Sequence, residues 1–291
     1  MRYRIRHETA YVYDEIVSLC HNELRLEPRA TDGQRALGTA LAIEPQPSAL
    51  AAELDYFGNP THFFTVEEAH DRMVLLAESE VELAAPDAEP LWTRAWDALR
   101  ADVRGDTSPP GLAALEMCFA SPLVPLAPEF AAYAAPSFEP RRPVLDAALE
   151  LSHRIHADFA YRPGATSVTT PVADVLETRE GVCQDFAHVA LACLRVLGLP
   201  ARYVSGYLHT RAAPGAARLV GADASHAWVS IFCGEAGWLG LDPTNDLLVA
   251  DQHVTLAWGR DYGDVPPIKG VILGGGGHRV EVGVDVEALP S

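Results

Sequence analysis

Cys183, His226 and Asp242 are the residues whose types and spacing could together carry out nucleophilic chemistry. Cys183 opens a run with helical periodicity, and the first turn of a helix stabilises a thiolate through its free N–H groups and its dipole. A thiolate that attacks a carbonyl carbon also needs an imidazole to move protons and a carboxylate to fix the imidazole tautomer. The alternative for any single cysteine is a small buried apolar side chain, and we assign that role to Cys193, on the apolar stripe of the same helix.

Helix geometry separates the remaining histidines from His226. His188 lies five residues after Cys183 on the same predicted helix, so at about 100° per residue it should point away from the thiol, and we expect a surface or supporting role. His153 and His156 are spaced for one helical face and could bind a metal, but no carboxylate is placed beside them. We therefore expect neither a metal site nor a cofactor.

His226 opens a predicted strand, 226–232, and Asp242 ends the next one, 238–242. If the register sum of this hairpin is even, both residues share one face with Trp228, and Asp242 lies opposite His226 or one step diagonal to it. An odd register would break this arrangement. The alternative is then an exposed histidine and a strand-end aspartate before a proline.

The chain of 291 residues is long enough for about two domains. Residues 1–85 contain several short alternating runs and predict an antiparallel β-rich domain. Residues 86–143 form a connecting segment with a helix near 92–104 and eight prolines after position 108. Residues 144–291 are predicted as a catalytic domain with a helix at 144–156, the Cys183 helix, an antiparallel sheet and C-terminal strands. The expected fold class is α+β.

Composition excludes several function classes. The net charge of −18 disfavours binding to nucleic acid or to anionic membranes. The five cysteines are an odd number without CxxC spacing, which favours reduced thiols over disulfides or a cysteine-rich zinc site. The first residues contain no apolar stretch typical of a secretory signal, so we expect a cytoplasmic protein. The sequence does not indicate the oligomeric state.

Six segments resemble the bacterial transglutaminase-like family. Three of them hold Cys183, His226 and Asp242, in that order, 43 and 16 residues apart. The segments are Gly181-Val-Cys-Gln-Asp-Phe-Ala-His188, Leu197-Gly-Leu-Pro-Ala-Arg-Tyr-Val-Ser-Gly-Tyr207, Ala222-Asp-Ala-Ser-His-Ala-Trp228, Gly240-Leu-Asp-Pro-Thr-Asn245, Asp55-Tyr-Phe-Gly-Asn-Pro60 and Trp258-Gly-Arg-Asp-Tyr262. The resemblance implies a papain-like core in which a nucleophile helix packs on an antiparallel sheet, preceded by a β-rich domain.

The same resemblance implies that Cys183 is the nucleophile, His226 the general base and acid, and Asp242 the residue that orients the imidazole. A thioester would form on Cys183, with its backbone N–H as one oxyanion donor. Gln184, Tyr161 and Trp228 are candidates for the second donor or for substrate contact. We expect hydrolysis of a peptide or amide bond. The alternatives are acyl transfer to an amine, as in a transglutaminase, and a non-catalytic peptide-binding scaffold.

Overall fold

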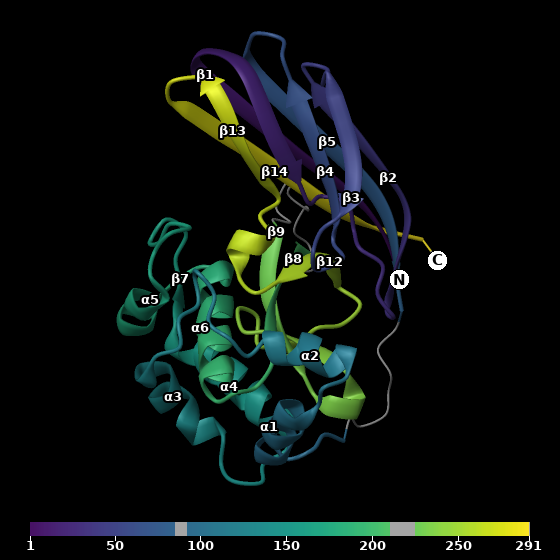
Figure 1. The fold of residues 1–291 in the computed structure, drawn as a ribbon. Helices are drawn as coiled ribbons and strands as arrows, with labels where there is room; N and C mark the ends of the chain where they lie inside the picture. The colour runs from purple at the N-terminus through teal and green to yellow at the C-terminus, as the bar shows by residue number, and fades with distance from the viewer. Residues whose placement is uncertain (85–91, 210–224, 291) are drawn as a thin grey trace, which may run out of the picture.

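The computed structural model describes residues 1–84, 92–209 and 225–290. A β-sheet lobe stands on a second lobe in which helices surround a smaller sheet (Figure 1). The predicted α+β fold class is confirmed. Within the described ranges, none of the helices is long and apolar enough to span a bilayer.

The first lobe is organised around one long strand, β1 (Arg2–Leu24). Its side chains alternate as the sequence predicts, because Tyr3, Ile5 and His7 are buried while the arginines between them are exposed. The sheet order is β2-β5-β1-β4-β3, with β13 and β14 also paired to β1. The other four strands of that path are β2 (Gln34–Glu44), β3 (Ala49–Leu54), β4 (Pro60–Val66) and β5 (His70–Leu83).

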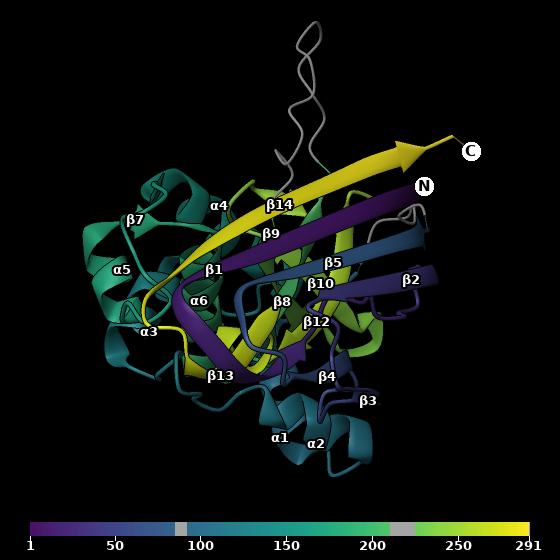
Figure 2. The same cartoon turned by 90° about the horizontal axis from the view of Figure 1, so that it is seen from above.

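The last two strands correct the predicted domain organisation. We expected the C-terminal strands to belong to the catalytic domain, 144–291, but β13 (Ile268–Gly274) and β14 (His278–Leu289) both pair with β1 of the first lobe. The turn between them has a positive φ at Gly274, Gly275 and Gly276, which glycine adopts without steric cost. Figure 2 shows β14 (yellow) lying beside β1 along the top of the molecule.

The connecting segment, 86–143, is more helical than its prolines suggest. It contains α1 (Trp96–Gly105), α2 (Pro109–Glu116), α3 (Pro128–Ala134) and the short 3₁₀ helix η1 (Ala135–Ser137). Pro109 and Pro128 each occupy the first position of a helix, where the missing N–H has no intrahelical partner to lose. Leu99, Val103 and Phe130 of this segment are buried in the same core as the catalytic lobe.

The catalytic lobe places a central helix against an antiparallel sheet. Its helices are α4 (Val144–Asp158), α5 (Val172–Thr178) and α6 (Cys183–Val196), with the short parallel pair β6 (Ala160–Tyr161) and β7 (Glu180–Gly181) between them. The sheet order is β11-β10-β9-β8-β12. These strands are β8 (Ala201–Leu208), β9 (Ser225–Phe232), β10 (Trp238–Asp242), β11 (Leu247–Leu248) and β12 (His253–Gly259). Short 3₁₀ helices η2 (Gly234–Ala236) and η3 (Tyr262–Asp264) follow β9 and β12.

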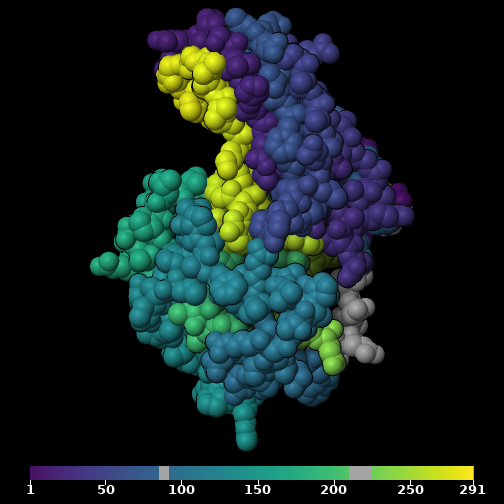
Figure 3. Space-filling model, in the orientation of Figure 1, coloured from purple at the N-terminus to yellow at the C-terminus, as the bar shows by residue number. Residues whose placement is uncertain are grey.

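Side-chain hydrogen bonds hold the two lobes together. Gln34 donates to the carbonyl oxygen of Thr255 at 2.7 Å, and Asn59 donates to that of Trp258 at 2.9 Å, both on β12. A third contact joins His7 of β1 to the hydroxyl of Tyr207 on β8 at 2.7 Å. The first lobe is therefore anchored on the edge of the catalytic sheet. Figure 3 shows the C-terminal hairpin (yellow) standing clear of the helices below it, with an open notch between them.

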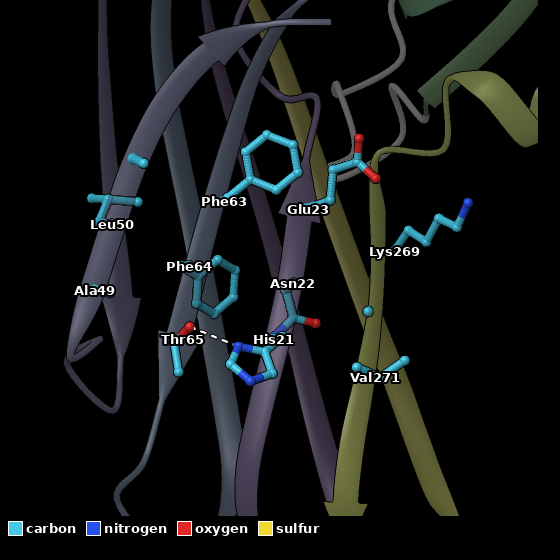
Figure 4. A pocket seen from close by; sticks show the side chains of 12 residues that line it. His21, Asn22, Glu23, Ala49, Leu50, Phe63, Phe64, Thr65, Lys269 and Val271 are labelled. Carbon is cyan, nitrogen blue, oxygen red and sulfur yellow. Dashed lines mark hydrogen bonds between the residues drawn. The ribbon is translucent and has the colours of Figure 1, made fainter.

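A hollow of about 480 Å³ lies on the outer face of the first lobe, between β3, β4 and β13. Phe63 and Val271 contribute apolar surface, and His21 contacts the Thr65 hydroxyl at 2.8 Å (Figure 4). None of the predicted catalytic residues lines this hollow.

Candidate active site

The N-terminus of α6 presents Cys183 as its first helical residue, as the sequence predicts. Asp185 folds back over this turn, and its Oδ2 accepts hydrogen bonds from the Val182 backbone N–H at 2.8 Å and the Thr166 hydroxyl at 2.6 Å. A Cβ at position 181 would lie 2.7 Å from that oxygen, so the position before the helix requires Gly181. Asp185 is thus committed to capping the helix that carries the thiol.

Strand register brings Asp242 to His226. Gly240 pairs with Ser230 and Leu241 with Val229, which is the even register and places Asp242 diagonal to His226 on the same face. The Asp242 Oδ2 lies 2.8 Å from His226 Nε2. The Cys183 side chain lies close enough to the imidazole to contribute to the rise of its pKa. Because Nε2 is occupied by the carboxylate, Nδ1 is the nitrogen that faces the thiol.

The charges of this group are coupled. Burial opposes a charge on His226, but hydrogen bonds and charge attraction from Asp242 and Cys183 outweigh it and raise the pKa of the imidazole to about 9. Burial likewise opposes the Asp242 carboxylate, but hydrogen bonds from His226 and His253 outweigh it, so its pKa lies below the usual range. Neighbouring groups therefore favour a proton on His226 and none on Asp242.

Two further side chains hold the Asp242 carboxylate, and the sequence analysis assigned a role to neither. Asn245 Nδ2 donates to Oδ2 at 2.7 Å, and His253 Nε2 lies 3.2 Å from the same oxygen. The backbone N–H of Asn245 and that of Thr244 reach Oδ1 at 3.2 Å and 3.0 Å. The turn sequence after Asp242 could have indicated Asn245, since such turns return N–H groups to an aspartate. No local pattern marks His253, because β12 reaches the site across the sheet.

His153 and His156, weighed above as metal ligands, instead hold the turn that follows Asp242. His153 Nδ1 lies 2.7 Å from the Asp246 carboxylate, and His156 Nδ1 lies 2.9 Å from the carbonyl oxygen of Thr244. Within the residues that the structure describes, no group of three His, Cys, Asp or Glu side chains could hold a metal ion. Helix α4 thus supports the turn that carries Asn245.

His188 does not lie on the surface, and that part of the expectation is wrong. It is 4% exposed, its Nε2 accepts a hydrogen bond from the Tyr262 backbone N–H at 3.2 Å, and burial lowers its pKa to about 4. The error came from treating α6 as amphipathic. Helices α3, α4 and α5 and the sheet contact it on different sides, so α6 has no wide solvent-facing side.

The remaining candidate residues differ in their exposure and in the groups that they contact. Gln184 follows Cys183 and its amide reaches the Val168 carbonyl oxygen at 3.5 Å. Tyr161 is half exposed, packs on Phe186 and has its pKa raised by burial and by the charge of Cys183. Trp228 is 1% exposed, and its ring contacts His253 with centroids 5.2 Å apart. The Ala-, Gly- and Pro-rich composition of segment 210–221 predicts a cover for the cleft, but this segment lies outside the described residues.

Comparison with known proteins identifies the family of both lobes. Residues 3–82 match the family model of the bacterial transglutaminase-like N-terminal region, and residues 131–243 match that of the transglutaminase-like superfamily. Uncharacterized protein Rv2569c of Mycobacterium tuberculosis is 40% identical over 298 residues, which cover 99% of this chain and 93% of that protein. A protein-glutamine gamma-glutamyltransferase of Pseudomonas aeruginosa is 39% identical over 92 residues, 31% of this chain and 14% of that protein.

A solved structure shares the whole fold. The crystal structure of a "Putative Cysteine Protease from Cytophaga hutchinsonii" superimposes with a TM-score of 0.78 at 21% identity, covering 100% of this chain and 91% of that one. The likeness extends over both lobes, including the strands that close the first sheet. The chain therefore belongs to the transglutaminase-like superfamily, with the bacterial transglutaminase-like N-terminal region preceding its core.

Proposed function

We propose that the protein hydrolyses a peptide or amide bond through a thioester on Cys183. The observation that carries this proposal is the continuous contact from the Cys183 thiol through His226 to Asp242. A scaffold that only bound peptides would not need these three side chains to lie next to one another in this order. The intact set supports an enzyme over a non-catalytic scaffold.

The reaction would proceed in two steps. The Cys183 thiolate attacks the carbonyl carbon, and the His226 imidazolium gives its proton to the leaving amine as the C–N bond breaks. His226 then accepts a proton from a water molecule whose oxygen attacks the thioester, which releases a carboxylic acid and restores the thiol. Asp242 fixes the tautomer of the imidazole and stabilises its charged form throughout.

The negative oxygen formed in each step needs donors near the helix terminus. The backbone N–H of Cys183, at the first position of α6, has no partner within the helix and can donate to it. Gln184 and Tyr161 are candidates for the second donor, because one follows the nucleophile and the other lies near its charge. Trp228, behind His226, would contribute by packing rather than by donating.

The second candidate function is acyl transfer to an amine, which the name of the Pseudomonas aeruginosa relative supports. Carboxylates near the thiol could attract a cationic amine, but Asp185 caps α6 and Asp242 holds His226. Asp223 lies outside the described residues. Since water needs no dedicated acceptor site, we favour hydrolysis. We also propose a reducing compartment, such as the cytoplasm, in which Cys183 stays a thiol.

The test is acylation followed by competition. p-Nitrophenyl acetate should acetylate Cys183 with release of nitrophenol, and peptide mapping by mass spectrometry should locate the acetyl group there rather than on Lys269. Methylamine is then added at millimolar concentration, and free acetate and N-methylacetamide are measured. Mainly acetate supports hydrolysis, whereas mainly amide would assign the protein to acyl transfer.

Two matched variants complete the experiment. Cys183→Ala should lose the acetylation, and Cys233→Ala, which alters a buried thiol elsewhere, should keep it. A folded wild-type protein in which Cys183 is not acetylated faster than Cys233 would favour the scaffold alternative.

A further inference from the structure

A cavity lined by polar and aromatic side chains lies between the lobes, on the face of the catalytic sheet that carries His226. This cavity of about 520 Å³ separates the turn at residues 30–33 from this face. Its walls include Trp228, Ser230 and Thr255, and Arg202 extends from β8 into the same lining. This volume lies in the range of sites that bind small molecules.

Arg202 is enclosed by aromatic rings. Its guanidinium carbon lies 4.3 Å from the ring centre of Trp238 and 3.6 Å from that of Trp258. Arg29 lies 3.1 Å from the Trp258 ring centre, so two guanidinium groups this close to one ring must occupy its opposite faces. These contacts stabilise the planar faces of the Arg202 guanidinium.

The edge of the Arg202 guanidinium has no such partner. Its Nε is buried without an acceptor, and no hydrogen bond or ion pair to Arg202 occurs among the residues that the structure describes. Contacts with ring faces do not satisfy N–H donors that lie in the guanidinium plane. Arg29 also has a buried Nε without an acceptor, but its Nη1 donates to the side chain of Asn59 and to the Phe57 carbonyl oxygen.

Arg202 is a partly buried cation without a counterion among the described residues. Burial and repulsion from Arg29 lower the pKa of Arg202 to about 9, which still leaves it charged near neutral pH. Partial removal of a charged group from water without pairing it is unfavourable. A binding role would account for keeping such a group beside a cavity.

We propose that this cavity binds a carboxylate, held by Arg202 and flanked by tryptophan side chains. A carboxylate carries one negative charge and fits the fork of N–H donors of a guanidinium. A phosphate would bring a second charge, but Arg29, the next guanidinium, is not among the residues that line the cavity. The apolar walls favour a carboxylate that is attached to an aromatic or aliphatic group.

This site is separate from the thiol chemistry. Ser230 lies four residues after His226 on β9, which corresponds to roughly 13 Å along a strand. Trp228, between them on the same face, is buried and separates the cavity from the imidazole. Binding should therefore persist in a Cys183→Ala variant, so the proposal can fail or succeed independently of the proposed hydrolysis.

The experiment is calorimetric titration of the full chain with phenylacetate, phenylacetamide and acetate. We expect saturable binding of phenylacetate, much weaker binding of the uncharged amide, and weaker binding of acetate, which lacks the ring. A short peptide with a free C-terminal carboxylate, compared with its C-terminal amide, shows whether a chain end also fits. Absence of saturable binding of any carboxylate at millimolar concentration, or equal binding of phenylacetamide, would overturn the proposal.

Variants locate the site. Arg202→Gln should weaken phenylacetate binding at least about tenfold, since it removes the charged donors, whereas Arg72→Gln, at an exposed arginine of β5, should leave it unchanged. Asp32 is exposed on the rim of the cavity and its charge repels an anion. Asp32→Asn should therefore tighten binding about twofold. Asp32→Asn tests the site even if Arg202→Gln fails to fold. An unchanged affinity of Asp32→Asn for phenylacetate would contradict the proposal.

Discussion

His253 and Asp242 are joined by a contact of 3.2 Å between Nε2 and Oδ2, inside the core of the catalytic lobe. The other ring nitrogen, Nδ1, faces the Ala250 backbone N–H at 3.5 Å and can only accept there. The neutral ring therefore carries its proton on Nε2 and donates it to Asp242. His226 shares this carboxylate oxygen, so its orientation depends on a second histidine.

That dependence predicts the behaviour of two substitutions at position 253. His253→Leu removes a donor to the Asp242 carboxylate, which then interacts more strongly with the His226 imidazolium. The pKa of this imidazole should therefore rise, and the basic side of the pH profile for turnover of p-nitrophenyl acetate should move up by about one pH unit. His253→Gln keeps a donor amide and should restore most of the wild-type profile. If the pH profiles of His253→Leu and His253→Gln are shifted equally from that of the wild type, His253 acts through packing alone.

Cys183 should be the first of the five cysteines to react with iodoacetamide at mildly acidic pH. It is the one that is not fully buried, and it touches an imidazole. Burial raises the pKa of Cys118 to about 11 and that of Cys233 to about 12, which suppresses their thiolates. Peptide mapping after brief labelling measures the order. Faster labelling of Cys20 or Cys118 would contradict the nucleophile assignment.

Asp242→Asn should preserve the fold but lower turnover of an acyl substrate by about four orders of magnitude, because the amide stabilises the wrong imidazole tautomer. Circular dichroism checks the fold, and release of nitrophenol from p-nitrophenyl acetate under multiple-turnover conditions measures the rate. Asp246→Asn, next to Asn245, is the matched control and should cost far less activity. Full activity of folded Asp242→Asn would remove the carboxylate from the mechanism.

Two histidine variants should separate catalysis from stability. His226→Ala should abolish turnover with little change in melting temperature. His188→Ala should do the opposite, since it leaves a cavity and the Tyr262 backbone N–H without its acceptor; we expect a loss of about 1–3 kcal/mol in unfolding free energy. Chemical denaturation and the nitrophenol assay, applied to both proteins, measure the two effects. Loss of activity in a folded His188→Ala protein would mean that His188 acts on the site.

Stability should fall as the pH decreases from about 6.5 towards 4. Burial lowers the pKa of His7 and that of His188 to about 4, so in this window the unfolded chain binds protons that the folded chain excludes. Each histidine contributes a loss of up to about 3 kcal/mol. His7→Gln should flatten the dependence, and His278→Gln, at an exposed histidine, should not. Equal slopes in all three proteins would show that these rings do not control acid unfolding.

Short sequence patterns predicted the elements that are determined by residues close together in the sequence. The bounds of β10 and the start of α6 at Cys183 follow from short-range periodicity, whereas the sequence left open the register that joins His226 to Asp242. The contribution of His253 could not be predicted, because its approach depends on β12 crossing to the far side of β8.

The pairing of β14 with β1 was missed for a related reason. An alternating run predicts a strand but does not identify its partner when the partner lies more than 200 residues away. The burial of His188 was missed because helix periodicity describes one apolar face, whereas three helices and a sheet enclose α6.

The pairing of Arg2 with Leu289 also sets an order of events during synthesis on the ribosome. Strand β1 is synthesised before the catalytic lobe, whereas β14, its neighbour along half of its length, is synthesised after that lobe. Until then one edge of β1 has unpaired N–H and C=O groups, which in a nascent chain can pair with another strand. This edge of β1 therefore stays unpaired until β14 has been synthesised, and it is the place where we expect a ribosome-associated chaperone to bind the nascent chain.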